Sequence, residues 1–276
     1  MTPLRRTLAA LLAVVVVALV APVGARSAPT WAPADEATIH PGVQTYTEGA
    51  QCTANFVFTN GTDTFLGQAA HCSGTGGNTE TNGCEAGTLP LGTPVEIDGA
   101  SRPGTLVYNS WIAMQQSGET DEDTCLSNDF ALIKIDPADV DSVNPSVPAW
   151  GGPTALGTST TEGEDVFSYG NSSLRLGISA LSPKTGVALF QSESGRTHTV
   201  YTVTPGIPGD SGSGFLNSSG EAIGVLSTLQ VLPMAAANDV ADLASALDYA
   251  QAHGFSADLV PGTEPFSGDL GGLTRG

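Results

Sequence analysis

The sequence predicts an all-β protein with one α-helix near its C-terminus, and three observations support this fold class. Glycine and proline are frequent, at 34 and 18 of 276 residues, which is typical of short strands joined by turns. Short apolar segments recur between turn signals, whereas a helical spacing of apolar residues is convincing at one place only. About 250 residues follow the predicted leader, a length that suits one large β domain or two small ones.

The first 28 residues have the pattern of a secretory signal peptide. Arg5 and Arg6 precede an apolar run over residues 8–20, and small residues follow up to Ala28. A charged start, a short apolar stretch and a small-residue cleavage site define such leaders. The alternative is a membrane anchor, but the run is shorter than the roughly 20 residues of a spanning helix. We therefore expect a secreted, extracellular protein that has no membrane contact after signal removal.

The mature chain is expected to be strongly acidic. Three of the nine basic residues lie in the leader, which leaves six against 28 acidic residues, a net charge of about −22. A charge of this sign favours solubility and disfavours nucleic acid as a partner, because binding to phosphates needs positive charge.

The chain contains four cysteines, at positions 52, 72, 84 and 125. In an exported protein an even number of cysteines indicates disulfides. A zinc site is disfavoured, because no two cysteines have the spacing of a ligand pair and only His71 lies near any of them. We therefore expect no metal site, and spacing alone leaves three possible disulfide pairings.

In chain order, residues 29–38 form a short extended lead-in, and a β-hairpin follows. Residues 52–58 and 64–67 read as two strands around an Asn60-Gly61 turn, a strong hairpin signal. Residues 130–135 are almost continuously apolar and predict a buried strand.

The stretch from residue 136 to about 164 is rich in Pro, Gly, Ser and Thr and predicts an inter-domain linker. It divides the chain into an N-terminal β domain over residues 39–150 and a C-terminal one over residues 151–255. Further strands are expected at residues 165–169, 187–190 and 200–203, with a hairpin from residues 215–216 and 222–226.

The one convincing helix is expected after an N-cap at Asn238 or Asp239 and ends before Gly254. Its apolar stripe consists of Val240, Leu243, Leu247 and Ala250, at three- and four-residue intervals. Residues 256–276 are rich in Gly and Pro and are expected to form a flexible tail.

Three segments contain residue types with catalytic chemistry. They are residues 66–72 around His71, residues 127–134 around Asp129, and residues 208–214 around Ser211. Each segment alone has a structural explanation, but together they give the order His, Asp, Ser, each at the edge of a predicted strand. This arrangement resembles the chymotrypsin family of serine proteases over about residues 39–255. The resemblance implies two antiparallel six-stranded β-barrels, a C-terminal helix and a cleft between the barrels.

The resemblance also implies the roles of these residues. A serine hydroxyl needs a base to take its proton as it attacks a carbonyl carbon, and histidine suits this role because its pKa lies near neutrality. Ser211 would be the nucleophile, His71 the general base, and Asp129 would orient the imidazole. The expected reaction is hydrolysis of a polypeptide through an acyl-enzyme, without a cofactor, by a protein that is monomeric by default.

The loop before Ser211 supplies the expected oxyanion hole. The amides of Gly209 and Ser211 would hold the developing oxyanion, and loss of one such donor costs about 3 kcal/mol in comparable sites. In relatives the aspartate before the nucleophile makes an internal ion pair. Asp210 would do so here with Arg175, as in the shorter bacterial branch of the family.

The resemblance implies a Cys52–Cys72 disulfide beside the catalytic histidine and, with it, a Cys84–Cys125 bridge. Two departures from the family pattern, Gln68 and Ser213-Gly214, remove no catalytic atom.

Substrate contacts are implied in two segments. Pro205 and Gly206 would form the floor of the specificity pocket, with Leu229 on its wall, and Ser227, Thr228 and Leu229 would pair with an extended substrate backbone. Ser227 would also hydrogen-bond Asp129. Because no carboxylate lies on this floor, we expect uncharged, small or medium apolar side chains at the cleaved position.

Three alternatives stay open. The acidic run over residues 119–123 could bind calcium, although its spacing does not match an EF-hand and a solvated charge run is the simpler reading. The same fold could serve as a catalytically silent binding module. An esterase would use the same residues, but the strand–elbow–helix context of such enzymes is absent around Ser211.

Overall fold

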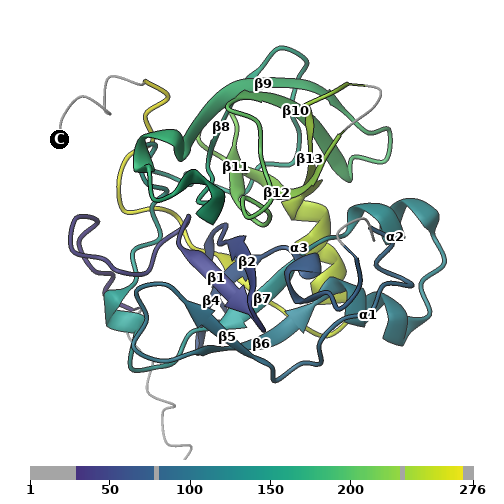
Figure 1. The fold of residues 1–276 in the computed structure, drawn as a ribbon, viewed down its shortest axis with the longest axis horizontal. Coiled ribbons are helices and arrows are strands. Elements are labelled where there is room, and N and C mark those ends of the chain that lie inside the picture. Colours follow the sequence, from purple (N-terminus) through teal and green to yellow (C-terminus); the bar gives the residue numbers. More distant parts are fainter. Residues whose placement is uncertain (1–28, 78–80, 231–233, 270–276) are drawn as a thin grey trace, which may run out of the picture.

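The computed structural model describes residues 29–77, 81–230 and 234–269, which form mostly antiparallel β-strands. In Figure 1 two β layers lie one above the other, and the helix α3 (Leu243–Ala252) lies beside their junction. The predicted signal peptide at residues 1–28 lies outside the described residues. Within the described ranges, no helix has the length and apolar character needed to cross a bilayer.

The first sheet contains eight strands in the spatial order β14, β3, β4, β7, β6, β5, β1, β2. The amide of Ala54 donates to the carbonyl oxygen of Val43, which directly precedes β1. The amide of Asn55 donates to the carbonyl oxygen of Gly67 in β4. The chain over β2 and β3 is therefore one bent strand that closes the sheet on itself, so that six strands make a barrel and β14 is added from the C-terminus. The strands are β1 (Gln44–Thr47), β2 (Ala50–Thr53), β3 (Val57–Thr59), β4 (Thr64–Gln68), β5 (Pro94–Ile97), β6 (Gly104–Asn109), β7 (Ala131–Lys134) and β14 (Asp258–Leu259).

The second sheet is a closed six-stranded barrel in the order β10, β13, β12, β11, β8, β9. All of its strand pairs are antiparallel. The all-β class with a C-terminal helix is thereby confirmed. The strands are β8 (Asp165–Tyr169), β9 (Pro183–Gln191), β10 (Thr197–Val203), β11 (Gly214–Leu216), β12 (Ala222–Leu229) and β13 (Asn238–Asp242).

The hairpin predicted around Asn60-Gly61 is present as β3 and β4. Gly61 has a φ of 82°, a left-handed conformation that glycine adopts without steric cost. The Asn60 side chain accepts hydrogen bonds from the amides of Thr62 and Asp63. Gly61 therefore supplies the left-handed conformation of the turn, and Asn60 supplies its side-chain hydrogen bonds.

Two short helices were not predicted from the sequence: α1 (Ser110–Ser117) and α2 (Glu122–Ser127). Asp121 is the N-cap of α2 and accepts from the amide of Thr124, and the Glu119 carboxylate accepts from the amides of Thr120 and Asp121. Two carboxylates of the acidic run thus hydrogen-bond local backbone amides. The helices α1 and α2 are too short to produce a clear apolar periodicity in the sequence.

The start of the C-terminal helix was predicted wrongly. Residues Asn238–Asp242 form β13, which pairs with both β10 and β12. The helix begins at Leu243, and its N-cap is Asp242, whose carboxylate accepts from the amide of Ser245. Closure of the barrel decides the conformation here, because pairing with two neighbouring strands outweighs a weak local helical pattern.

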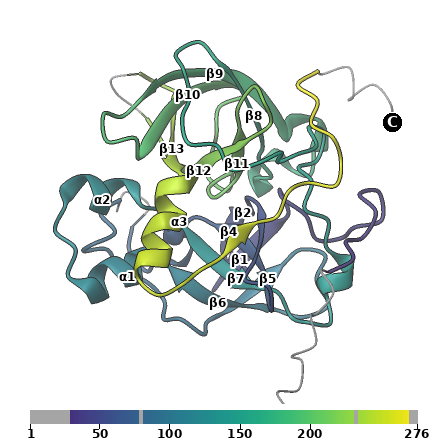
Figure 2. The same ribbon diagram turned by 180° about the vertical axis from the view of Figure 1, so that it is seen from behind.

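The expected flexible tail differs in the structure over residues 256–269, whereas residues 270–276 lie outside the described residues. Residues Asp258–Leu259 form β14 and pair with β3, and Phe266 packs on Phe167 with ring centroids 5.4 Å apart. Figure 2 shows this segment running from α3 along the first sheet toward the second barrel. Strand pairing and aromatic burial, which depend on residues far away in the sequence, hold it in place.

The predicted linker connects β7 to β8 and carries Trp150, which is buried and donates to the carbonyl oxygen of Ser168. Apolar side chains of both sheets meet around it in one continuous cluster that includes Phe56, Phe130 and Leu216. Packing of this kind fixes the two sheets relative to each other. The domain limits at residues 150 and 255 remain a prediction.

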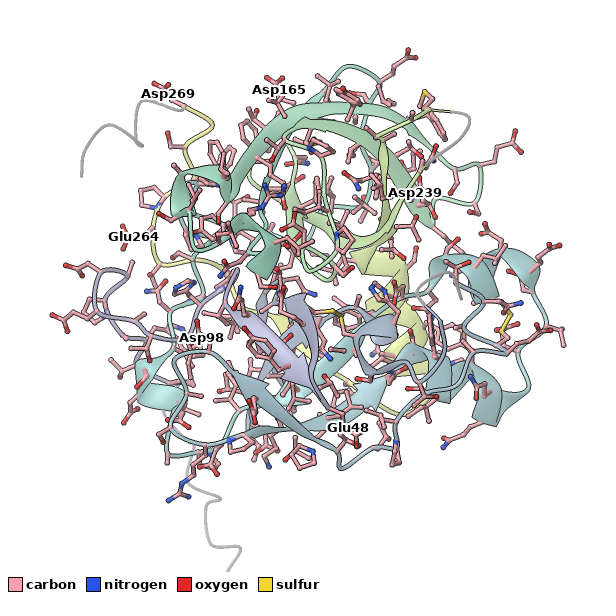
Figure 3. The ribbon with its side chains drawn as sticks, viewed as in Figure 1. Glu48, Asp98, Asp165, Asp239, Glu264 and Asp269 are labelled. Carbon is pink, nitrogen blue, oxygen red and sulfur yellow. A yellow bond between two sulfur atoms is a disulfide. The ribbon has the colours of Figure 1, made fainter. Side chains whose placement is uncertain are left out.

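The acidic residues are distributed over both sheets. The labelled carboxylates in Figure 3 come from loops and strands of both halves and are not gathered into one patch.

Candidate active site

The backbone of His71 is fixed by its attachments to the first sheet. It lies in the short 3-10 helix η1 (Ala70–Ser73), directly after the fully buried strand β4. The next residue, Cys72, is bonded to Cys52 in β2, and the His71 carbonyl oxygen accepts from the amide of Gly74. The backbone at His71 is thus fixed by a strand, a disulfide and a turn.

Asp129 makes three hydrogen bonds that orient it toward His71. Its Oδ2 lies 2.7 Å from His71 Nδ1, and its Oδ1 accepts from the His71 backbone amide at 2.9 Å. Ser227 Oγ donates to Oδ2 at 2.6 Å, as expected from the sequence. The carboxylate is buried, so its negative charge is compensated mainly by these donors.

The pKa values of the two groups shift in opposite directions. Burial alone would lower the pKa of His71, but the Asp129 charge and hydrogen bond outweigh it and raise this pKa above 6.5. Burial alone would raise the pKa of Asp129, yet His71, Ser227 and the backbone amide of His71 lower it below its usual value. An ionised Asp129 next to a readily protonated His71 is the result.

Two glycines with positive φ shape the loop around Ser211. Gly209 has a φ of 93° and Gly212 a φ of 88°, which side chains other than glycine rarely adopt. A Cβ at Gly209 would lie 2.3 Å from the side chain of Gln51. The loop is also tied to β2, because the Thr53 hydroxyl donates to the carbonyl oxygen of Gly209 and the Thr53 amide to that of Ser211.

Two amides of this loop donate to no group within the described part of the chain. The amides of Asp210 and Gly212 donate to backbone carbonyls. In the part of the chain that the structure describes, those of Gly209 and Ser211 have no protein acceptor. Two unpaired donors on either side of one residue suit a negatively charged oxygen.

The cleft that contains these groups has a volume of about 610 Å³ and is lined by residues of both sheets. It brings together eight of the nine residues predicted for catalysis and substrate binding: His71, Asp129, Gly206, Gly209, Ser211, Ser227, Thr228 and Leu229.

One group of potential metal ligands, Cys52, His71 and Cys72, has its ligand atoms within 4.8 Å of one another. The two sulfur atoms are bonded to each other, so neither is a thiolate that could bind a metal ion. This group is therefore not a suitable metal site.

The sequence profile of the trypsin-like peptidase domain family matches residues 53–225, which is more than half of the chain. The chain belongs to this family. By family and fold it is a chymotrypsin-like serine protease. No curated protein sequence matches it significantly.

Solved structures of bacterial proteases share the fold of this peptidase. Thermobifida fusca Protease A is 18% identical with a TM-score of 0.52, over 81% of this chain and 99% of that one. Nocardiopsis Protease is 16% identical with a TM-score of 0.50, over 80% and 98% of the two chains. A glutamic acid specific serine protease is also 16% identical with a TM-score of 0.50, over 80% and 100%.

Asp210 of the peptidase is fully buried and faces two cations. Arg175 Nη2 lies 2.5 Å from Asp210 Oδ2, which confirms the ion pair expected from the sequence. Lys184 Nζ lies 3.0 Å from the same oxygen and was not expected. A lone lysine near the start of a strand gives no sequence signal that its side chain points inward.

The floor of the predicted specificity pocket differs in one residue. Pro205 is not among the residues that line the cleft, and its carbonyl oxygen accepts from Lys184 Nζ. Asn238 lines the cleft instead, and its Oδ1 accepts from the amide of Gly206. Sequence reasoning missed Asn238 because it interpreted this residue as a helix cap.

Both disulfides of the peptidase follow the implied pairing. Cys52–Cys72 ties β2 to η1, and Cys84–Cys125 ties α2 to the turn at residues 82–86.

Proposed function

We propose that this chain is a secreted serine endopeptidase that hydrolyses peptide bonds through an acyl-enzyme. Ser211 is the nucleophile, His71 the general base and Asp129 the residue that orients His71. The observation that carries this proposal is the 2.7 Å contact between His71 Nδ1 and Asp129 in a cleft that Ser211 also lines.

In this proposal His71 Nδ1 keeps its proton and donates a hydrogen bond to Asp129, which leaves Nε2 unprotonated as the acceptor for the Ser211 proton. Attack of Ser211 Oγ on the substrate carbonyl then gives a tetrahedral intermediate and a protonated His71. The imidazolium donates its proton to the leaving amine, and the acyl-enzyme forms. A water molecule activated by the same histidine completes hydrolysis.

The amides of Gly209 and Ser211 are proposed as the oxyanion hole. Neither donates to another group of the described chain, and the loop that carries them is fixed by Thr53 and by the buried Asp210. Donors that are already in position need no reorganisation when negative charge develops on the substrate oxygen.

Residues 227–229 are proposed to bind the substrate backbone. β12 extends to Leu229, while β11 pairs with it only as far as Val225. One edge of residues 227–229 therefore has no strand partner in the described chain, and an extended polypeptide could add to it as a further strand. Secretion is supported by the leader pattern of the sequence and by two disulfides.

Cleavage is expected after uncharged, small or medium apolar residues. The residues that line the proposed specificity pocket are not ionisable; they are Gly206, Leu226, Thr228 and Asn238. One structural relative is glutamic acid specific and uses a histidine triad in substrate binding, whereas His71 is the sole histidine among the described cleft residues. Digestion of an unfolded protein, with cleavage sites identified by mass spectrometry, tests this preference. Predominant cleavage after Arg, Lys or Glu would show that the pocket is wrongly assigned.

The proposed function is tested by the intact mass of the processed protein before and after reaction with a fluorophosphonate. Wild-type protein should gain one adduct, because an activated serine attacks the phosphorus atom. The Ser211→Ala variant should gain none, and it should be processed at the same site and show the same unfolding temperature.

A folded, processed wild-type protein that forms no adduct and cleaves no polypeptide would contradict the endopeptidase proposal. The catalytically silent binding module would then be the better interpretation of the fold.

A further inference from the structure

Lys184 is a charged side chain with no accessible surface. Its relative exposure is 0%, and so is that of Asp210, the carboxylate that it contacts at 3.0 Å. Nζ also lies 3.2 Å from the carbonyl oxygens of Thr204 and Pro205. Lys134, by contrast, makes a partly exposed ion pair with Asp63 on the first sheet.

The buried cluster contains more positive than negative charge. Arg175 and Lys184 both contact Asp210 Oδ2, so two cations share one carboxylate. Arg175 is itself only 8% exposed. A surplus charge away from water is costly unless other groups stabilise it. Here the carbonyl oxygens of residues 204 and 205 accept from the ammonium, but they carry no full charge.

The contacts of Lys184 lie at both ends of the segment that carries the proposed oxyanion hole. Thr204 and Pro205 begin this segment, and Asp210 stands between the two amides assigned to the oxyanion, those of Gly209 and Ser211. Asp210 Oδ2 also accepts from the amide of Ile207 in the middle of the segment. The ammonium group of Lys184 thus contacts the start and the end of residues 204–210 directly, and it is linked to the middle of the segment through Asp210.

We propose that Lys184 is a positioning residue for peptide hydrolysis, whose ammonium group fixes residues 204–210 and stabilises the oxyanion through the surplus positive charge of the Arg175–Asp210–Lys184 cluster. This inference rests on the proposed function. The positive charge is present before the reaction, and the negative charge appears only in the transition state, so the interaction acts mainly on kcat.

The ionisation of Lys184 gives the proposal a pH signature. Burial and the nearby Arg175 lower the pKa of Lys184, while Asp210 acts in the opposite direction without cancelling them. The other groups that it contacts, at Thr204 and Pro205, are uncharged. Above the lowered pKa the ammonium becomes neutral, and activity that depends on its charge is lost as pH rises.

Lys184→Met tests the proposal, because methionine has a similar length and no charge. We expect kcat to fall about tenfold, less than for loss of a direct oxyanion donor, with KM changed by less than twofold. Affinity for a peptide aldehyde, whose adduct with Ser211 carries the oxyanion, should fall in parallel with kcat. The fold should persist, because Asp210 keeps its pair with Arg175.

Lys134→Met is the matched control. It removes a lysine from a partly exposed ion pair and should leave kcat, KM and aldehyde affinity unchanged. Lys184→Arg is the second variant, because a guanidinium stays charged at all accessible pH values. It should retain kcat at neutral pH and lose the decline of activity at alkaline pH that we expect of wild type.

The proposal is overturned if Lys184→Met retains wild-type kcat, or if Lys184→Arg keeps the alkaline decline. Should Lys184→Met fail to fold, the pH profile of Lys184→Arg decides alone. In all of these results wild-type protein still forms the fluorophosphonate adduct, whereas failure of the endopeptidase proposal abolishes that adduct.

Discussion

Replacing His71 with glutamine should lower kcat about 10⁶-fold, and adding Ser211→Ala should lower it little further. Glutamine has no group that accepts a proton near neutral pH, so Ser211 would remain protonated and unreactive. Because nucleophile and base act as one unit, loss of either removes nearly the whole contribution of both. Initial rates on a peptide amide, with the protein concentration of each preparation measured by absorbance, measure this effect.

His198→Gln is the matched control for this variant. His198 is fully buried and lies 2.9 Å from Asp242, so it reproduces the histidine–aspartate contact of the proposed site. It lies in β10 and is absent from the residues that line the cleft. Its replacement should lower the unfolding temperature and retain kcat. Equal losses of kcat in both variants would mean that His71 acts through the fold and not through chemistry.

Much of the site could be predicted because its signals are local. His71, Asp129 and Ser211 each lie in a short contiguous motif, although the contacts that join the three motifs come from residues far apart in the sequence. The segments that carry them are short strand ends and turns, and their glycines have the positive φ values that the loop needs. The partner of Asp210 could be anticipated only through the family resemblance, since Arg175 is 35 residues away in the sequence.

The rest depends on contacts between distant residues. Residues 238–242 have a helical pattern when read alone, but they complete the second barrel by pairing with β10 and β12. Residues 258–259 become a strand only because β3 has a free edge for them. Lys184 is buried because Asp210 and two carbonyl oxygens meet its ammonium group, and none of these partners is near it in the sequence. Burial of polar groups is decided by such partners.

Replacing Asp129 with asparagine should lower kcat about 10⁴-fold while the fold is retained. The amide oxygen can keep the hydrogen bond from the His71 backbone. The amide nitrogen then faces His71 Nδ1 and donates to it, which puts the ring proton on Nε2. In this tautomer the histidine cannot accept the Ser211 proton.

The pH profile distinguishes this explanation from a loss of packing. In the proposed mechanism the neutral form of His71 is the base, so kcat/KM should decline as pH falls through a His71 pKa that Asp129 holds above 6.5. Without the carboxylate charge, burial alone acts on the imidazole and lowers this pKa, so the decline should move to lower pH. Asp242→Asn is the control, because Asp242 contacts the buried His198 outside the cleft and can still cap α3 as asparagine. A decline at the same pH in wild type and Asp129→Asn would mean that Asp129 does not set the ionisation of the catalytic base.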